Sequence, residues 1–570
     1  MKVSLAGYNV EHELASELTK AGVVPTPETI SAAYARVSRS RKDVEELRHE
    51  ARREIVRSRR SNQTIVFDMG HHSIAEHAVF NFDIIGASRL AVEALEHHRL
   101  NSYTERSQRY VSLSNDFVVP AEFEDDELRE DFTATVKLQN RYYHLLCERL
   151  QQYLREKHPS EDPAVTETGA KEDARYITSL ATRTQLGFTV NARNLELVVR
   201  RLSAADLAEV RELGTELYRQ AVAVAPSLLV FTGPTGYEKT TRNRLREYAT
   251  SFMVPAFPRR PKNFIAHSAS DVTLVDYSPN ADNKLLAAMM HSNSKASFAE
   301  CLARIERQTL ARKKEIFKLA CQDLQAYDAV LREFEHLYLS FELVISASCY
   351  AQLKRHRMMT VTCQPYNPNV GWTIPVSVAE IKEHKNFKEI LARTEETHAR
   401  LAARNPVAAQ YVLTNAHQRR VVVTMNAREL YHVSRLRQDM TAQWDIRDIA
   451  GRMVEQARHV MPLTLSLAEG KDGYARVYQE LFGQPPAVTN LELPIRRALP
   501  EEARLPAQEA EESEAGADAG KKAKPARKSA KKQTRTRQRT NQKSEVKRQK
   551  SEVRKAGQRG KRKSETREGK

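Results

Sequence analysis

Alternating apolar residues mark two distant segments of the chain. In the first half they are Phe80, Phe82 and Ile84, and in the second half they are Leu337, Leu339, Phe341 and Leu343. Alternation at a period of two predicts a half-buried β-strand in each segment. Small and aliphatic residues then recur at helical spacing, namely Ala87, Leu90, Ala91 and Leu95 after the first strand and Ala347, Tyr350 and Leu353 after the second. The pattern therefore predicts a strand followed by a helix in both halves.

A cluster of basic residues follows each predicted helix. The first lies in the run HHRLNSYTERSQRY, from His97 to Tyr110, which holds almost no apolar residue and is not typical of a packed core. The second consists of Arg355, His356 and Arg357. Strand, helix and basic cluster thus occur twice in the same order, which indicates a diverged tandem duplication.

A second matched unit lies downstream of each basic cluster. Gln185–Leu202 and Arg419–Arg437 are each predicted to be a strand that runs into a helix, with a shared Asn-Ala-Arg at the junction that begins at Asn191 and Asn426. An asparagine at this point can cap the helix, and the free amides of the first turn can bind an anion. Both asparagines can equally be plain helix caps, and the pattern alone leaves this open.

Long helices are predicted in two segments rich in Leu, Ala and Arg, Asp131–Lys157 and Ser297–His336. Both carry apolar residues at spacings of three and four, which favours an amphipathic helix packed on a core. We therefore expect an α/β (α+β) fold of two tandem domains, residues 1–240 and 241–498, each built from a sheet and long helices.

The chain ends in a segment of different composition. From about Leu499 it consists largely of Ala, Glu, Lys, Arg, Gln and Ser, and residues 521–570 hold 22 Lys and Arg against 4 Glu. The net charge of +17 therefore belongs to this segment, and the rest of the chain is nearly neutral. We predict that residues 499–570 form a disordered Lys/Arg-rich tail. Such a tail either contacts nucleic acids or acidic surfaces without sequence preference, or is a solvating extension with no partner.

Membrane and secreted classes find no support in the sequence. No run of about eighteen apolar residues suggests a membrane span, and no signal peptide opens the chain. The five cysteines are spread without a Cys-x-x-Cys pair, which argues against a disulfide framework or a zinc knuckle. We therefore expect a soluble, cytoplasmic protein that does not interact with membranes.

Common catalytic motifs are also missing. Neither a Gly-rich phosphate loop nor a Gly-x-Ser-x-Gly elbow is present, which argues against P-loop, Rossmann and hydrolase sites. His71, His72 and His77 cluster with Glu76, but their spacing differs from the i, i+4 pair of a zincin helix, and we expect no metal site. Any bound nucleotide is thus expected to be held by side chains.

The run from His97 to Tyr110 resembles the signature of the flavin-dependent thymidylate synthases, Arg-His-Arg-x-x-Ser-x-Asn-Glu-x-Ser-x-Arg. The matching residues are His98, Arg99, Ser102, Glu105, Ser107 and Arg109. Other family hallmarks are similar to Gly70–Arg89 and Ala174–Leu180 in the first half, and to Phe334–Leu343, Gln352–Arg357 and Thr424–Ala450 in the second. The chain is therefore identified as a diverged tandem member of this family, also called thymidylate synthase complementing proteins.

Each half departs from the family pattern where the other half keeps it. In the first half the family's substrate-side Gln and Arg, its polarising Arg and the signature Asn are replaced by Ala94, His97, Leu202 and Thr104. In the second half the signature Glu, Ser and final Arg and the phosphate-side Arg are replaced by Cys363, Pro365, Asn367 and Gln410. The losses are complementary.

The resemblance therefore implies a composite substrate site. The second repeat would supply Gln352, Arg355 and Arg437, with Arg437 as the catalytic group that polarises the uracil ring. The first repeat would supply Glu105, Arg106, Ser107, Gln108, Arg109 and Arg175, of which Arg109 and Arg175 suit the phosphate. Since family enzymes are homotetramers with sites between subunits, we expect a homodimer of tandem chains that imitates a tetramer and keeps half of its sites.

The activity implied by the resemblance is reductive methylation of dUMP to dTMP. FAD is the expected cofactor, and NADPH and methylenetetrahydrofolate are the expected co-substrates. By resemblance, the FAD contacts are His71, His98, Arg99, Ser102, Glu105, Asn191, Arg193, Arg355, His356, Arg357, Asn426, Arg428 and His432. Thr441 stands where many members carry a His.

Two other functions stay open. The chain can be a catalytically inactive homologue that keeps the fold and binds a flavin or nucleotide without methylating dUMP. It can also be a nucleic-acid-binding scaffold that acts through the basic tail. Bound flavin without turnover would indicate the first, and loss of function on deletion of the tail would indicate the second.

Overall fold

The computed structural model describes residues 1–10, 26–37, 40–113, 115–253 and 271–487. Residues Met1–Glu492 belong to one compact unit. The predicted tail, residues 499–570, lies outside the described residues, and the predicted domain boundary at residue 240 stays a prediction. In the described part of the chain, no helix is both long enough and apolar enough to cross a membrane.

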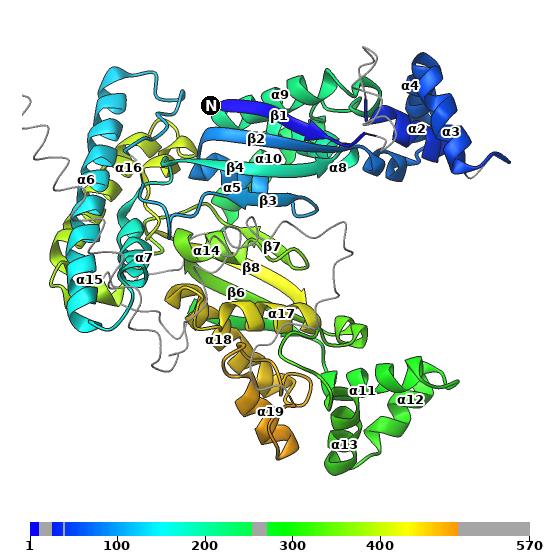
Figure 1. The fold of residues 1–570 in the computed structure, drawn as a ribbon. Coiled ribbons are helices and arrows are strands. Elements are labelled where there is room, and N and C mark those ends of the chain that lie inside the picture. The colour runs from blue at the N-terminus through cyan, green and yellow to red at the C-terminus, as the bar shows by residue number, and fades with distance from the viewer. Residues whose placement is uncertain (11–25, 38–39, 114, 254–270, 488–570) are drawn as a thin grey trace, which may run out of the picture. The chain divides into compact units, whose positions relative to one another are not determined.

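Two antiparallel sheets of four strands form the framework, and they share one strand order (Figure 1). The first sheet has the order β1-β2-β4-β3, with β1 (Lys2–Tyr8), β2 (Val79–Ser88), β3 (Ser102–Glu105) and β4 (Arg183–Asn191). The second has the order β5-β6-β8-β7, with β5 (Val272–Tyr277), β6 (Tyr338–Ser346), β7 (Thr360–Cys363) and β8 (Gln418–Asn426). The shared order confirms the predicted duplication.

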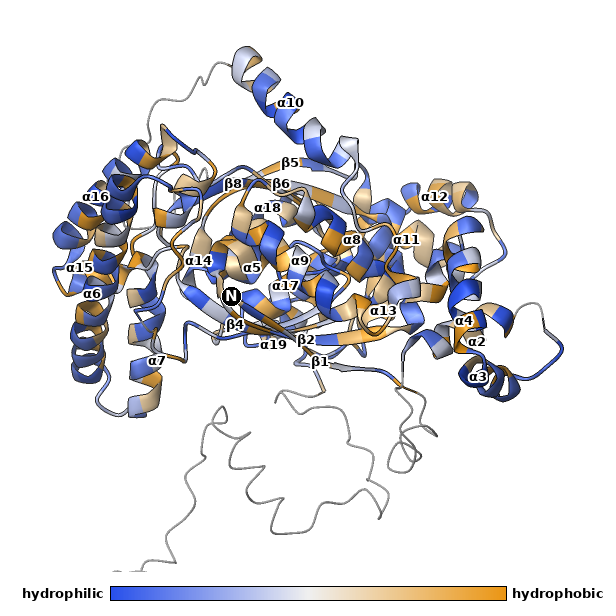
Figure 2. Cartoon of the chain, turned by 90° about the horizontal axis from the view of Figure 1, so that it is seen from above, coloured by the Kyte–Doolittle hydropathy of each residue, from blue (hydrophilic) through white to orange (hydrophobic). Residues whose placement is uncertain are grey.

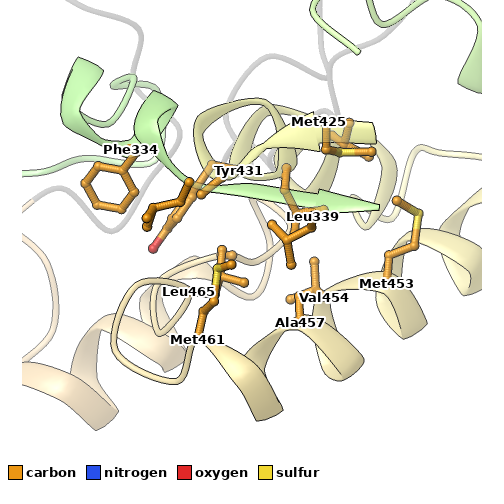
Figure 3. Packing of buried hydrophobic residues seen from close by; sticks show 14 of the residues in the cluster. Phe334, Leu339, Met425, Tyr431, Met453, Val454, Ala457, Met461 and Leu465 are labelled. Atoms are coloured by element: carbon orange, nitrogen blue, oxygen red, sulfur yellow. The ribbon is translucent and has the colours of Figure 1, made fainter. Parts of the chain in front are cut away.

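Both predicted strands are confirmed, as β2 and β6. Phe80, Phe82 and Ile84 are buried along β2 in the predicted alternation. Along β6 the predicted apolar positions from Leu339 onward are buried, but so are Ser340 and Val344 on the other face, so this strand is not half-buried. Figure 3 shows Leu339 facing the side chains of a helix that carries Met453, Val454 and Ala457. Each sheet therefore buries one face under helices of its own repeat.

The helices that follow the strands also correspond between the repeats. Ser88 and Ser346 cap the helices after the central strands, and Asn191 and Asn426 cap those after the next strands, each by accepting a backbone N–H. The four capped helices are α5 (Arg89–Glu96), α14 (Ala347–Leu353), α8 (Ala192–Ser203) and α17 (Ala427–Arg437), and α8 and α17 are followed by α9 (Ala208–Val222) and α18 (Trp444–Val460). In Figure 2 they lie between the two sheets.

The helix after β2 begins later than predicted. Ala87 is still part of β2, and α5 starts only at Arg89, because Ser88 takes an extended conformation and accepts the N–H of Ala91. The remaining helical positions, Leu90 and Leu95, point into the core as expected.

Helices of both repeats join in a layer beside the sheets (Figure 1). Its members are α6 (Asp126–Lys157), α7 (Pro163–Ala174), α15 (Val376–Glu380) and α16 (His384–Ala402). The long helix predicted at Asp131–Lys157 is confirmed as α6. Its Thr135 and Gln139 bond to Thr397 and Thr394 of α16 at 2.9 and 2.8 Å, so the layer links the repeats.

The prediction of a second long helix at Ser297–His336 is wrong, because the segment contains two shorter helices. The segment forms α12 (Phe298–Glu306) and α13 (Leu310–Cys321), because the side chains of Ser297 and Thr309 each cap a new helix. Their apolar faces pack around Cys301, Ile305 and Phe317. The other helices are α2 (Glu28–Val37), α3 (Val44–Arg53), α4 (Ile55–Asn62), α10 (Gly236–Phe252), α11 (Ala281–Ser292) and α19 (Tyr474–Phe482).

The two repeats exchange backbone hydrogen bonds around a local pseudo-twofold axis. Ser179 and Thr414, which are equivalent in the repeats, face each other as an antiparallel bridge. Leu180 N–H donates to the carbonyl of Leu413 at 2.8 Å, and Asn415 N–H donates to that of Thr178 at 2.9 Å. All these residues are buried, so separating the repeats would leave several backbone groups without partners.

Two buried carboxylates reinforce this contact symmetrically. Asp445 accepts hydrogen bonds from Tyr176 of the first repeat at 2.7 Å and from Ser346, the cap of α14, at 2.6 Å. On the other side, Glu209 accepts from Tyr411 of the second repeat at 2.7 Å and from Ser88, the cap of α5, at 2.6 Å. Each carboxylate therefore connects a helix cap of its own repeat to a tyrosine of the other repeat.

One buried ion pair breaks the symmetry. Glu96 and Lys354 occupy equivalent positions, next to His97 and Arg355, and form an ion pair of 2.6 Å with side chains only 7% and 5% exposed. Two identical repeats in this arrangement would bring like charges together at this point. Opposite charges therefore favour pairing of a first repeat with a second one.

Reversing one charge of this pair tests that conclusion. In Lys354→Glu two buried carboxylates would face each other, and we expect a loss of about 3–5 kcal/mol in the free energy of unfolding, measured by chemical denaturation. The double variant Glu96→Lys/Lys354→Glu should regain the part of the loss that belongs to this pair, but not all of it, because Lys354 also attracts Glu93 and Glu105. The exposed pair Lys157 and Glu380 provides the control, since Lys157→Glu should cost no more than about 1 kcal/mol. A double variant as unstable as the single one would contradict the conclusion.

Candidate active site between the repeats

Predicted substrate-side residues from both repeats meet at one side of the pseudo-twofold axis. The first repeat contributes Glu105 at the end of β3, Arg109 in the following loop, and Arg175, which opens a 3-10 turn after α7. The second contributes Gln352 near the end of α14 and Arg437 as the last residue of α17. The helix and strand ends thus direct their polar side chains to one place.

Arg437 lies among cations from both repeats. Its Nε donates to Nε2 of His356 at 2.9 Å. Burial first, and then the guanidinium groups of Arg355 and Arg109, lower the pKa of Arg437 to about 10. Arg437 therefore stays charged at neutral pH and repels its neighbours, an arrangement that a bound anion would stabilise.

Arg109 connects the repeats at this point. Its Nε pairs with Glu172, and its Nη2 donates to the backbone carbonyl of Thr441 in the second repeat at 3.2 Å. The backbone carbonyl of Glu172 also accepts from Nε of Arg175 at 3.2 Å. The two predicted phosphate-side arginines are thus held by one residue.

Arg175 is a buried cation with spare donors. Its residue is only 6% exposed, and its Nη2 is buried without a hydrogen-bond partner among the described residues. Burial lowers the pKa of Arg175, and the nearby Arg89 and Arg109 add to this effect, whereas Glu172 and Tyr176 oppose it. An anion next to Nη2 would satisfy the donor and offset the repulsion.

Glu105 is held as a carboxylate. It forms an ion pair with Arg89, and its side chain is 1% exposed. Burial would raise the pKa of Glu105, but the charges of Arg89, Lys354 and Arg355 outweigh it, so the pKa lies below the usual range. Two of these cations come from the second repeat, which places Glu105 at the boundary of the repeats.

Gln352 is fixed by a chain of hydrogen bonds that crosses the repeats. Its Nε2 donates to Oε1 of Gln443 at 2.6 Å, and Nε2 of Gln443 donates to the hydroxyl of Tyr176. Tyr176 in turn donates to Asp445. Because every residue in this series of hydrogen bonds is buried, the position of Gln352 depends on the contact between the repeats.

Buried polar atoms without partners concentrate in this region. Among the described residues they include Nε of Arg89, Nη1 of Arg99, Oε2 of Glu105, Nε2 of Gln108 and Nη2 of Arg175. Buried polar groups are normally hydrogen-bonded, so such a concentration indicates a site for a polar ligand. The remaining predicted residues, Arg106 and Ser107, lie in the same loop, and Oγ of Ser107 accepts the N–H of Arg109 at 3.1 Å.

Part of the predicted cofactor set also gathers between the repeats. Arg357 of the second repeat donates to Oγ of Ser102 in the first at 3.2 Å. Tyr350 and Glu429 of the second repeat oppose the lowering of the pKa of Arg99 by burial, so Arg99 lies close to them. Burial, Arg201 and His97 lower the pKa of His98 to about 4, which keeps this imidazole neutral.

The other predicted cofactor residues are engaged elsewhere. Asn191 and Asn426 cap α8 and α17 as predicted, and anion binding at these helix ends stays a prediction. Arg193 pairs with Glu76, and Arg428 pairs with Glu335 at 2.9 Å and donates to the carbonyl of Val330. His71 lies in an exposed turn before a 3-10 helix, His72–His77. The structure does not bring these residues to the cluster around Arg437.

One trio of side chains has the composition of a metal site. His356, Glu429 and His432 offer ligand atoms that lie within 4.8 Å of one another. Because Nε2 of His356 accepts from Arg437, its proton resides on Nδ1, which faces Glu429 at 3.6 Å. A protonated Nδ1 cannot bind a metal ion, and the charge of Arg437 disfavours one nearby. The trio therefore serves to orient Arg437.

Four residues at the site were not predicted from the sequence. They are Arg89, Glu172, Lys354 and Gln443. The signal for Lys354 was present, since alignment of the two basic clusters places it opposite Glu96. Glu172 and Gln443 carry no such signal, because their partners lie far away in sequence and only the fold brings them together.

The chain matches the thymidylate synthase complementing protein family over residues 19–227 and again over residues 273–463. A flavin-dependent thymidylate synthase of Clostridium tetani is 32% identical over 215 residues, which cover 37% of this chain and 84% of that protein. A UPF0159 protein of Chlamydia pneumoniae is 23% identical over 417 residues, 70% of this chain and 78% of that protein. This aligned stretch is longer than either family segment and spans both repeats.

Solved structures provide a further comparison. The flavin-dependent thymidylate synthase ThyX of Helicobacter pylori, in complex with FAD and dUMP, is 18% identical, with a TM-score of 0.26. The aligned region covers 39% of this chain and 93% of that one.

The cation cluster predicts a specific response to anions. Roughly 50 mM inorganic phosphate should raise the unfolding midpoint of the protein above that in sodium chloride of equal ionic strength. A phosphate concentration ten times the Kd would raise the free energy of unfolding by about 1.4 kcal/mol. Thermal denaturation measures the effect, and Arg175→Met should abolish it because the buried donor is lost. Arg312→Met, on an exposed arginine paired with Glu315, is the control and should respond like the unmodified chain. An equal response of Arg175→Met would contradict the assignment.

Proposed function

Because the chain belongs to the thymidylate synthase complementing protein family, which it carries in two diverged copies, we propose that it methylates dUMP to dTMP at one composite site between its repeats. The observation that supports this most strongly is the meeting of Arg109 and Arg175 with Arg355 and Arg437. Neither repeat holds the full set alone.

The chemistry of a pyrimidine monophosphate suits this arrangement. A phosphate dianion would pair with Arg109 and Arg175, whose forked donors match its oxygens. Arg437 would stabilise negative charge that develops on the uracil ring, since its own pKa of about 10 keeps it protonated. Gln352 would hold the ring through hydrogen bonds, in a position that Gln443 and Tyr176 fix.

The proposed reaction balances with two co-substrates. Together dUMP, methylenetetrahydrofolate, NADPH and a proton give dTMP, tetrahydrofolate and NADP⁺. The proton on C5 of uracil is released, the carbon arrives as a methylene group, and a hydride completes the methyl group. FAD, when bound, would carry that hydride from NADPH.

The residues around Arg99 fit the charge of a dinucleotide cofactor. Nη1 of Arg99 is buried without a hydrogen-bond partner among the described residues, and the exposed Arg357, its sequence equivalent in the second repeat, donates to Ser102. These groups would hold the negatively charged diphosphate of FAD, with Ser102 and His356 beside them. His71, Arg193 and Arg428 lie outside this group, and a second chain in a homodimer would have to complete the cofactor site.

The composite assignment is tested by a matched set of variants. We expect Arg437→Ala and Arg175→Ala each to lower the release of tritium from 5-labelled dUMP at least about 100-fold, because each removes a charge that the reaction needs. The equivalent positions of the other pairing, tested by Leu202→Met and Gln410→Ala, should change turnover less than about threefold, because Met keeps the volume of the buried Leu202. The assay uses purified protein with methylenetetrahydrofolate, NADPH and FAD.

Three outcomes of this assay are informative. Flavin that copurifies with an unmodified chain that releases no tritium would support an inactive homologue. A protein that contains no flavin and releases no tritium would support the nucleic-acid-binding function instead. Loss of activity in Leu202→Met equal to that in Arg437→Ala would contradict the composite site.

A further inference from the structure

The pseudo-twofold axis generates a second site opposite the one described. Its residues are the equivalents in the other repeat, namely Ala94, His97 and Leu202 from the first repeat and Cys363, Asn367 and Gln410 from the second. They lack the charges of Arg355, Arg437, Glu105, Arg109 and Arg175, and Ala94 stands in place of the amide of Gln352. The structure shows what has replaced them.

An internal ion pair fills this second site. Arg419 of β8 pairs with Glu93 of α5 across the repeats, and its guanidinium lies between the rings of Tyr366 and Tyr350, at 4.2 and 4.8 Å from their centroids. The hydroxyl of Tyr366 donates to Glu93 at 2.8 Å, and its backbone N–H donates to Gln410 at 3.0 Å. We call Glu93, Tyr350, Tyr366 and Arg419 the clasp.

The clasp residues have no counterpart in the first site. The positions equivalent to Glu93, Tyr366 and Arg419 hold Ala351, Gln108 and Thr184. Those residues are shorter or uncharged, so the first site lacks a side chain that reaches across the repeats in the same way. The second site therefore differs from the first in two ways: it has gained the clasp residues, and it lacks the charged residues of the first site.

The charges of the clasp satisfy one another. Burial would raise the pKa of Glu93, but Arg419 and Lys354 hold it below the usual range. Burial would likewise lower the pKa of Arg419, but Glu93 and the surrounding Tyr and Cys residues raise it. The backbone carbonyl of Gln364 also accepts from Nε of Arg419 at 2.8 Å.

Hydrogen bonding separates the two sites most clearly. In the described part of the chain, the first site holds four buried polar atoms without partners, on Arg89, Glu105, Gln108 and Arg175. No atom of the clasp or of Gln410 is in this state. The first site thus has donors and acceptors free for a ligand, whereas the buried polar atoms of the clasp are all paired.

We propose that the clasp takes the place of a ligand in the second site, so that each chain binds a single nucleotide and uses the other site to join its repeats. This rests on the proposed function for the identity of the nucleotide. The aromatic rings stabilise the guanidinium by cation–π contact, and the carboxylate neutralises it, as a phosphate would elsewhere. The cost of burying these charges is offset only while all partners are present.

Two variants of the full chain test the proposal. Calorimetric titration with dUMP should give one site per chain. Arg419→Met should lower the unfolding midpoint by roughly 5 °C and change the dUMP affinity less than about twofold. Arg109→Met should instead reduce the dUMP affinity at least about tenfold, because it removes a phosphate-side cation. Should Arg419→Met fail to fold, Tyr366→Phe removes only one hydroxyl and should lower the midpoint less, again at constant affinity.

The outcomes separate the clasp from the proposed function. Two dUMP molecules per chain, or a loss of dUMP affinity in Arg419→Met equal to that in Arg109→Met, would overturn the proposal. An unchanged midpoint in both clasp variants would overturn it as well. If the unmodified chain binds no dUMP, the proposed function fails, whereas the midpoints still decide whether the clasp joins the repeats.

Discussion

The backbone exchange around Ser179 and Thr414 is the contact on which the rest of the structure depends. It fixes the two repeats in antiparallel register, and the buried Asp445 and Glu209 then bond to side chains of the opposite repeat. Without this register, α17 would not present Arg437 beside Arg109. The site is therefore a property of the paired repeats rather than of either one.

Because both repeats are encoded in one chain, they can differ from each other in sequence. In a dimer of identical subunits, residues equivalent to Glu96 and Lys354 would have to be the same, and both sites would have to be alike. Here the axis carries opposite charges, with a cation cluster on one side and the clasp on the other. One site is free to supply polar groups to a ligand, and the other stabilises the contact that shapes the first.

The sequence predicted the repeated elements and part of the site, because those signals are local. Alternation identified β2 and β6, and the complementary losses pointed to Arg175 and Arg437 as partners. The sequence analysis did not predict that the helical segment is interrupted at Thr309, where the side chain caps a new helix although the apolar pattern continues. The clasp was also missed, since Glu93 and Arg419 are distant in sequence and meet only through strand register and the pairing of the repeats.

The central claim, that the nucleotide site forms within one chain, is tested most directly by dUMP binding to mixed chains. We would combine a chain carrying Arg109→Ala with one carrying Arg437→Ala, and compare them with an equal mixture of unmodified chain and a chain carrying both changes. A site within the chain predicts that the first mixture binds no dUMP and that the second binds half of the normal amount. Binding by the first mixture would contradict it, because intact sites would then have formed between chains.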